Sequence, residues 1–272
     1  MDDLSGAPLA DFDAALPLSP LGPRAWASQA DKRYWNAIGP WGGWTAALLL
    51  KAVLAEADHN GTPVAMTINL MGGLDETAPL ALMTRPARQG RSMEFWTSEL
   101  IQNDASAAMA MVTLGHRRDT LTAHEAEFPQ VAPPESLNPP ERRAGLAFGA
   151  MFESRYLPGA IPFQSEGGST ETFTWVRDAQ ARPLDYPLLA ALADVFAPRV
   201  FYRSAERRPV STVSMTVYFH ATPQELAAVG GDFVLAQARA RRFEAGFFDQ
   251  AGTLWSRDGL LLATTEQLCW FK

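Results

Sequence analysis

The sequence repeats one order of predicted elements, and this repetition constrains the fold more than any other feature. Each half contains an apolar helix that precedes four strand-like segments. In the first half the helix runs from the turn at 39–43 to about Ala55, and the strands lie at 64–71, 79–89, 91–102 and 107–115. In the second half the helix begins near Pro187, and the strands lie at 211–220, 232–242, 245–256 and 260–271. Helical spacing, partial alternation and turn signals support these assignments.

Each repeat is predicted to wrap an antiparallel sheet around its helix, and the two repeats are predicted to pair into one continuous sheet of an α+β fold. Shorter strand-like segments precede the helices at 25–29, 33–39, 150–157 and 170–178. A stretch rich in proline and charge, 128–143, is predicted to be a surface linker. It would separate an N-terminal unit at 1–127 from a C-terminal unit at 144–272.

Composition excludes several classes of protein. The net charge is −7 and basic residues do not cluster, so no nucleic-acid partner is expected. The apolar run 44–55 is broken by Lys51 and is shorter than the roughly 20 residues that span a bilayer, so no membrane partner is expected. The acidic N-terminus does not resemble a signal peptide, which predicts cytoplasmic residence. The single cysteine, Cys269, excludes an internal disulfide or a cysteine-based zinc site.

One carboxylate lies in an apolar context that demands an explanation. Asp194 is the only charge within 186–198, a run whose leucines, Val195 and Phe196 recur at helical spacing. An ionised group taken out of water without partners costs several kcal/mol, so Asp194 is hydrogen-bonded, protonated or kept for a task. An aspartate near a helix end can also cap a loop or face solvent, and position alone leaves that alternative open.

Several short segments keep a fixed order around this carboxylate. They are Gly39-Pro40-Trp41-Gly42-Gly43, Ala193-Asp194, Thr212 eight residues before His220 on one predicted strand, and 258–267. Together with the repeat, they resemble the double-hotdog thioesterases of the acyl-CoA thioesterase II type. The resemblance implies a double hotdog that hydrolyses acyl-CoA, with a water held by an aspartate, a threonine or serine, and a glutamine. Asp194, Thr212 and Gln267 occupy those places, and Ser211 or Ser214 could take the place of Thr212.

The implied chemistry suits these residue types. A carboxylate can accept a proton from water while an amide and a hydroxyl orient that water, which contributes about 10² to 10⁴ in rate. Burial should raise the pKa of Asp194 and hydrogen bonds should lower it, so the sequence leaves the net direction open. Gly42 and Gly43 would let a substrate approach the amides that open the first helix, although a tight turn explains them equally well.

Several arginines of the predicted strands could bind the phosphates of coenzyme A, although solvated strand faces explain them too: Arg88, Arg91, Arg239, Arg241 and Arg242. No cofactor is expected beyond the coenzyme A of the substrate. Exposed sheet edges and an apolar surface favour a homodimer or homotetramer.

Other hydrolytic sites are not predicted. The sequence contains no G-x-S-x-G motif, and its four histidines show neither H-E-x-x-H spacing nor a ligand cluster, so neither a serine triad nor a metal is expected. His220 is interpreted as a structural residue. Two alternatives remain: a noncatalytic acyl-thioester-binding double-hotdog protein, and a hotdog dehydratase or hydratase. The absence of histidine from both predicted helices disfavours the latter.

Overall fold

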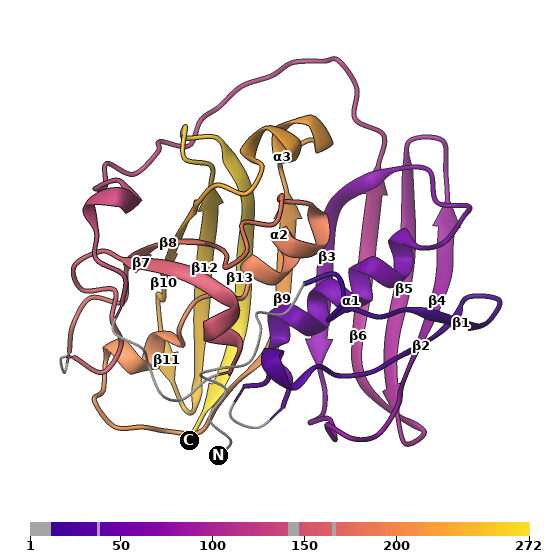
Figure 1. Ribbon diagram of the computed structural model, residues 1–272, viewed down its shortest axis with the longest axis horizontal. Coiled ribbons are helices and arrows are strands. Elements are labelled where there is room, and N and C mark those ends of the chain that lie inside the picture. The colour runs from indigo at the N-terminus through magenta and orange to yellow at the C-terminus, as the bar shows by residue number, and fades with distance from the viewer. Residues whose placement is uncertain (1–11, 37–38, 141–146, 165–166) are drawn as a thin grey trace.

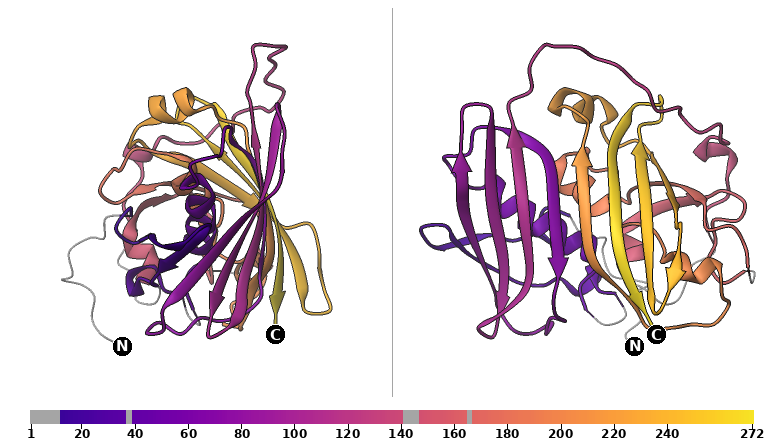
Figure 2. Two further views of the ribbon diagram at one scale, coloured as in Figure 1. Left: turned by 90° about the vertical axis from the view of Figure 1, so that its right-hand side faces the viewer. Right: turned by 180° about the vertical axis from the view of Figure 1, so that it is seen from behind.

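The fold is one long curved sheet with two central helices against its concave side (Figures 1 and 2). The computed structural model describes residues 12–36, 39–140, 147–164 and 167–272. The strands of the first half are β1 (Ser19–Gly22), β2 (Ala25–Ser28), β3 (Thr62–Leu70), β4 (Leu80–Gln89), β5 (Met93–Gln102) and β6 (Ala105–Gly115). Those of the second half are β7 (Phe152–Tyr156), β8 (Thr172–Asp178), β9 (Val210–Phe219), β10 (Val234–Arg239), β11 (Phe243–Glu244), β12 (Phe247–Trp255) and β13 (Leu261–Phe271).

Strand order confirms the predicted repeat. The sheet runs β1-β2-β4-β5-β6-β3-β9-β13-β12-β10-β8-β7, with β11 paired to β12 alone. Counted outward from the centre, the two halves therefore have the same order. The halves meet where β3 pairs antiparallel with β9, from Ala65 opposite Tyr218 to Asn69 opposite Ser214. The hydroxyls of Thr67 and Thr216 lie 3.1 Å apart across this seam. One hydrogen-bonded sheet thus joins both copies.

The central helices are α1 (Gly42–Leu54) and α2 (Tyr186–Leu192), and they pack against each other. Ten residues of α1 are buried, as expected for a helix that is apolar on every side. Its one charged residue, Lys51, reaches out to the main-chain oxygen of Leu16 at 2.7 Å. Asp185 caps the start of α2 by accepting from the amide of Leu188 at 2.9 Å, and Pro187 occupies the first turn. Both helices were predicted.

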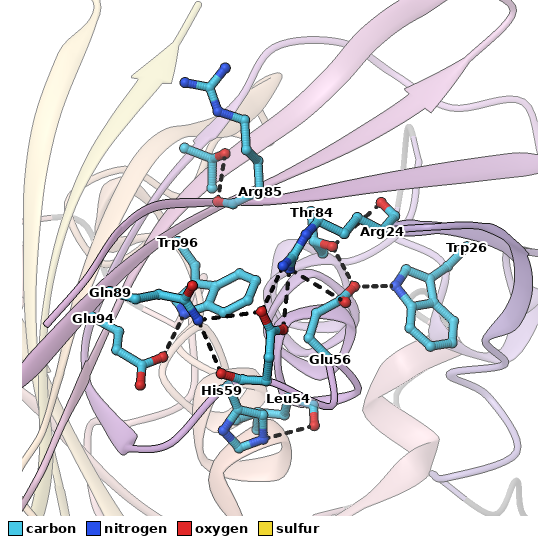
Figure 3. A network of polar contacts seen from close by, with 12 residues as sticks. Arg24, Trp26, Leu54, Glu56, His59, Thr84, Arg85, Gln89, Glu94 and Trp96 are labelled. Carbon is cyan, nitrogen blue, oxygen red and sulfur yellow. Dashed lines mark hydrogen bonds and ion pairs between the residues drawn. The ribbon is translucent and has the colours of Figure 1, made fainter. Parts of the chain in front are cut away.

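A polar network fastens the chain that follows α1 to neighbouring strands (Figure 3). Glu56 accepts hydrogen bonds from Trp26 Nε1 at 2.9 Å and Thr84 Oγ1 at 2.5 Å. Arg24 pairs with Asp58 at 2.7 Å. These contacts join the end of α1 to β2 and β4. The network therefore anchors the C-terminal end of α1 to the sheet.

The predicted linker is docked on the C-terminal half rather than extended into solvent. Phe128, Val131 and Leu137 pack against a cluster that includes Trp175, and Trp175 Nε1 donates to the main-chain oxygen of Ala132 at 2.9 Å. The unit limits at 127 and 144 stay predictions, and residues 141–146 lie outside the described part of the chain.

Two local predictions need correction. The segment 33–39 was predicted to be strand-like, but Lys32–Tyr34 forms a 3₁₀ turn because the Asp31 side chain accepts from the amide of Arg33; residues 37–38 lie outside the described residues. A third helix, α3 (Pro223–Val229), was not predicted, although Thr222 and Glu225 form a capping box at its start.

Candidate active site

Asp194 lies at the point where the end of α2 meets the start of α1. The helix α2 ends at Leu192, Ala193 caps it, and the amide of Asp194 donates to the main-chain oxygen of Ala191 at 3.0 Å. Only 9% of the residue is exposed. The indole of Trp41 donates to the main-chain oxygen of Asp194 at 2.9 Å, which ties this turn to the residue that precedes α1. The carboxylate is therefore buried and held, and it does not face solvent.

Burial determines the protonation of this carboxyl. Desolvation raises the pKa of Asp194 from 3.8 to about 7, against the opposing effects of the Gln267 side chain, the Gly43 amide and the Trp41 indole. The hydrogen bonds come from neutral donors, so they offset only part of the desolvation. The direction that the sequence left open is thus upward, and the group titrates close to neutral pH.

Gln267 contacts Asp194 directly and is itself held on all sides. It lies on the concave face of β13, and its Nε2 donates to Asp194 Oδ1 and to the main-chain oxygen of Ala193, both at 3.1 Å. Its Oε1 accepts from Gln250 Nε2 at 2.9 Å and from Thr212 Oγ1 at 3.4 Å. The amide therefore points its donors at the carboxylate, and Thr212 joins the group through Gln267.

A β-bulge turns Thr212 toward this group. On β9, Ser214 pairs with Leu268 but Thr212 pairs with Cys269, so Val213 is the extra residue. Side chains alternate between the faces of a strand, so without the bulge Thr212 would share the outer face with Ser214. Ser214 opposes Leu268, a residue 42% exposed on the outer face, and the hydroxyl of Ser211 donates to the main-chain oxygen of Thr212. Of the three hydroxyls that the sequence offered, only that of Thr212 bonds to Gln267.

Gly42 and Gly43 lie against the carboxylate and against α2. A Cβ on Gly42 would be 2.7 Å from Asp194 Oδ2 and 3.0 Å from Leu70 Cδ1. A Cβ on Gly43 would overlap the Trp41 ring and would be 2.5 Å from the main-chain oxygen of Ala191. The glycines therefore allow a close approach of α1, Asp194 and α2. The Gly43 amide already serves Asp194, and contact of either glycine with a substrate stays a prediction.

Arg91 is not brought to the other predicted residues. It is exposed in the turn between β4 and β5. The strand β5 is four strands away from β13, which amounts to about 19 Å at the usual strand spacing. The role of Arg91 as a phosphate ligand stays a prediction, because Arg91 does not lie close to Asp194, Thr212 or Gln267.

Three residues of the site were missed by the sequence analysis. Gln250 opposes Gln267 across β12 and β13, is 2% exposed, and orients the Gln267 amide. Trp41 and Cys269 were noted, but not as neighbours of this site; Cys269 Sγ lies 3.9 Å from both Thr212 Oγ1 and Gln267 Oε1. A glutamine at an inward position of a strand is the signal that would have identified Gln250.

The chain that leaves Asp194 is fastened by a buried arginine. Arg199 is 1% exposed and donates to the main-chain oxygens of Ala197 and Ala238 and to Thr172 Oγ1 at 2.6 Å. Burial lowers its pKa. These bonds hold the segment after Asp194 against β8 and β10.

No group of three or more His, Cys, Asp or Glu side chains within the described ranges is placed to hold a metal. Asp194, Gln267, Gln250 and Thr212 together form what we call the Asp194 group. His220 lies outside this group, with its Nε2 3.0 Å from Thr264 Oγ1, and burial lowers the pKa of His220. None of the helices in the described part of the chain is long and apolar enough to cross a membrane.

Comparison with known families identifies the chain. The model of the acyl-CoA thioesterase N-terminal domain matches residues 32–115, and that of the acyl-CoA thioesterase C-terminal domain matches residues 127–271, more than half of the chain. The chain belongs to the acyl-CoA thioesterase family. The resemblance drawn from the short segments is thereby confirmed.

Solved structures share the fold of this chain. A conserved protein of unknown function with a hot dog fold from Alicyclobacillus acidocaldarius is 37% identical, with a TM-score of 0.91 over 96% of this chain and 97% of that one. A putative thioesterase II from Thermobifida fusca is 19% identical, with a TM-score of 0.85 over 98% and 99%. The tesB protein of Mycobacterium avium subs paratuberculosis is 20% identical, with a TM-score of 0.80 over 97% and 100%. The predicted α+β double hotdog is confirmed. No curated protein matches the chain significantly.

Proposed function

We propose that this chain is an acyl-CoA thioesterase that hydrolyses an acyl-CoA to the free acid and coenzyme A, with Asp194 as the general base. The observation that carries the proposal is a buried carboxylate whose pKa is raised to about 7 and whose Oδ1 is held by Gln267. A base that titrates near the working pH is half available and still strong enough to accept a proton from water. Membership of the acyl-CoA thioesterase family supports the same reaction.

In the proposed reaction, the ionised Asp194 accepts a proton from water as the water oxygen bonds to the thioester carbonyl carbon. The carbonyl oxygen becomes an oxyanion, for which amides at the start of α1 are the proposed donors. The carbon–sulfur bond then breaks, and the thiolate of coenzyme A leaves and takes up the proton. Gln267 and Thr212 are proposed to orient the water and the carboxylate. Gly42 keeps the side of Oδ2 free of a side chain.

The test is release of free thiol from acetyl-, octanoyl-, palmitoyl- and benzoyl-CoA as a function of pH. We expect turnover of at least one substrate, with kcat/KM half-maximal near the pKa of about 7 and level at higher pH, because only the ionised carboxylate accepts a proton. Enzyme-free samples at each pH correct for spontaneous hydrolysis. Inactivity on every substrate would reject the proposal, and a flat profile from about pH 5 to 8 would reject Asp194 as the base.

The proposed role of Thr212 depends on its hydroxyl. Thr212→Val keeps the shape of the side chain and removes the bond to Gln267, so kcat should fall by roughly tenfold, the worth of one neutral hydrogen bond. Ser211→Ala is the matched control, because the Ser211 hydroxyl donates to the main-chain oxygen of Thr212 and is not bonded to Gln267. Its kcat should stay within about twofold of the wild type. Equal effects of the two substitutions in steady-state assays would remove Thr212 from the mechanism.

We also propose self-association, as a homodimer or homotetramer. The outer face of the sheet exposes large apolar side chains across neighbouring central strands: Met109, Met111, Tyr218, Leu268 and Trp270 are 37% to 48% exposed. Exposed apolar side chains gathered on one face of a sheet favour contact with a second protein surface. Cytoplasmic residence stays a prediction of the sequence.

A further inference from the structure

A cavity of about 740 Å³ next to the Asp194 group has an unusual lining. Four arginines and two phenylalanines contribute to it: Arg203, Arg208, Arg241, Arg242, Phe243 and Phe271. None of the described residues that line it is an aspartate or a glutamate. The chain as a whole carries 30 acidic and 23 basic residues, so this concentration of positive charge runs against the composition. The cavity therefore has the character of an anion site.

An apolar cluster lies between the floor of the cavity and the Asp194 group. Phe243 and Phe271 belong to a cluster of apolar side chains that also contains Val200, Phe248 and Cys269. The sulfur of Cys269, on the other side of that cluster, is 3.9 Å from Gln267 Oε1. The same apolar cluster therefore borders the cavity and, through Cys269, contacts Thr212 and Gln267.

Arg203 and Arg208 have hydrogen-bond donors that could bind a ligand. Within the described part of the chain, Arg203 donates to the main-chain oxygens of Gly167 and Gly168 and pairs with no carboxylate. Arg208 pairs with Glu206 through one amino group, and its Nε is buried without a partner.

The other two arginines make exchangeable ion pairs. Arg241 pairs with Asp249 and Glu266, and Arg242 pairs with Glu244. All of these pairs are open to solvent, where ion pairs contribute about 0 to 1 kcal/mol. A phosphate, which binds two guanidinium forks at once, competes well with them.

We propose that this cavity binds the 3′-phosphorylated adenosine diphosphate end of coenzyme A, with the arginines on its phosphates and a phenylalanine against the adenine. The proposal rests on the proposed function, and it names the thiol carrier of the substrate. The aromatic floor suits a flat base, because bases stack on aromatic side chains. An acyl group on a carrier protein would bring one phosphodiester and a large convex surface, which neither fills a concave cavity nor uses four arginines.

The test compares acyl-CoA with the matching S-acyl-pantetheine, which has the same thioester and no phosphates. The variant is Arg203→Ala/Arg208→Ala, and the control is Arg85→Ala, an exposed arginine of β4 outside the cavity. For the double variant we expect KM for acyl-CoA to rise at least about tenfold with kcat within about twofold, and KM for S-acyl-pantetheine to stay unchanged. The control should match the wild type with both substrates.

Direct binding separates failure of the cavity from failure of the reaction. Adenosine 3′,5′-bisphosphate, titrated by calorimetry, should bind the wild type and Arg85→Ala and should bind the double variant at least about tenfold more weakly. This holds even if no thioester is hydrolysed. The proposal is overturned if the bisphosphate binds all three proteins equally or none of them. It is also overturned if the double variant loses activity equally with both thioesters, or only with an acyl-carrier protein.

Discussion

Asp194→Asn is expected to lower kcat/KM by about 10²- to 10⁴-fold and, above neutral pH, to make the folded protein more stable than the wild type. The loss of activity follows because asparagine cannot accept a proton from water. The gain in stability follows because the wild type holds an ionised carboxylate in a site that disfavours charge, which raises its pKa to about 7. One substitution should therefore move activity and stability in opposite directions.

The sign of the stability effect follows from proton binding. Between about pH 4 and 7 the unfolded chain has lost the proton of Asp194 and the folded chain retains it, so the stability of the wild type falls as pH rises through this window. Above pH 7 the accumulated loss is at most roughly 4 kcal/mol, since each unit of pKa corresponds to about 1.4 kcal/mol. Asparagine resembles the protonated acid at every pH and escapes the loss.

Thermal unfolding of both proteins at about pH 5 and about pH 8 measures this effect. The difference in Tm, variant minus wild type, should be clearly larger at the higher pH. Asp258→Asn, in the exposed turn before β13, is the matched control and should show the same difference at both values. A fully active Asp194→Asn protein would exclude Asp194 as the base. A difference in Tm that does not depend on pH would mean that the carboxylate is not destabilised by burial.

Gly43→Ala should be the most damaging single-methyl substitution in the site. The added Cβ would overlap the Trp41 ring and lie 2.5 Å from the main-chain oxygen of Ala191, and neither group can move unless α1 separates from α2. We expect the free energy of unfolding to fall by about 3 kcal/mol, at the upper end of overpacking costs. Urea unfolding followed by far-UV circular dichroism would measure it.

Gly42→Ala is the matched comparison, because its Cβ meets side-chain atoms instead. The nearest are Asp194 Oδ2 at 2.7 Å and Leu70 Cδ1 at 3.0 Å, which can rotate away. We expect a smaller loss of stability and a loss of activity that exceeds it, since the displaced oxygen belongs to the proposed base. If Gly42→Ala and Gly43→Ala lower stability equally, the close contact between α1 and α2 is not the reason that glycine is needed at position 43.

The topology was accessible from the sequence because it depends on long periodic segments that occur twice. Asp194 was accessible for a related reason: a lone charge in an apolar run implies a buried, partnered carboxylate. The orientation of Thr212 was not accessible, because it depends on one extra residue at Val213 that no local pattern reveals. The direction of the Asp194 pKa shift was not accessible either, since it is a difference between two opposing effects.

The arginine-lined cavity could not be predicted from the sequence for another reason. Its residues come from 168–170, 200–208, 240–243 and Phe271, segments that have no common pattern and meet only in the folded sheet. Sequence reasoning offered Arg88, Arg91, Arg239, Arg241 and Arg242 together, and only Arg241 and Arg242 of these line the cavity. The sequence does not distinguish the arginines that line the cavity from the others, because only the folded chain brings them together.

The seam between β3 and β9 has a consequence for how the site can be divided. The glycines that open α1 and Leu70 come from the first copy, whereas Asp194 and Gln267 come from the second. A chain cut within 128–143 would therefore yield two fragments, each with a helix and half a sheet and neither with a complete site. We expect the proposed thioesterase activity to return only when the two fragments associate through β3 and β9. The two halves of the chain would then behave like the subunits of an obligate heterodimer that are covalently linked.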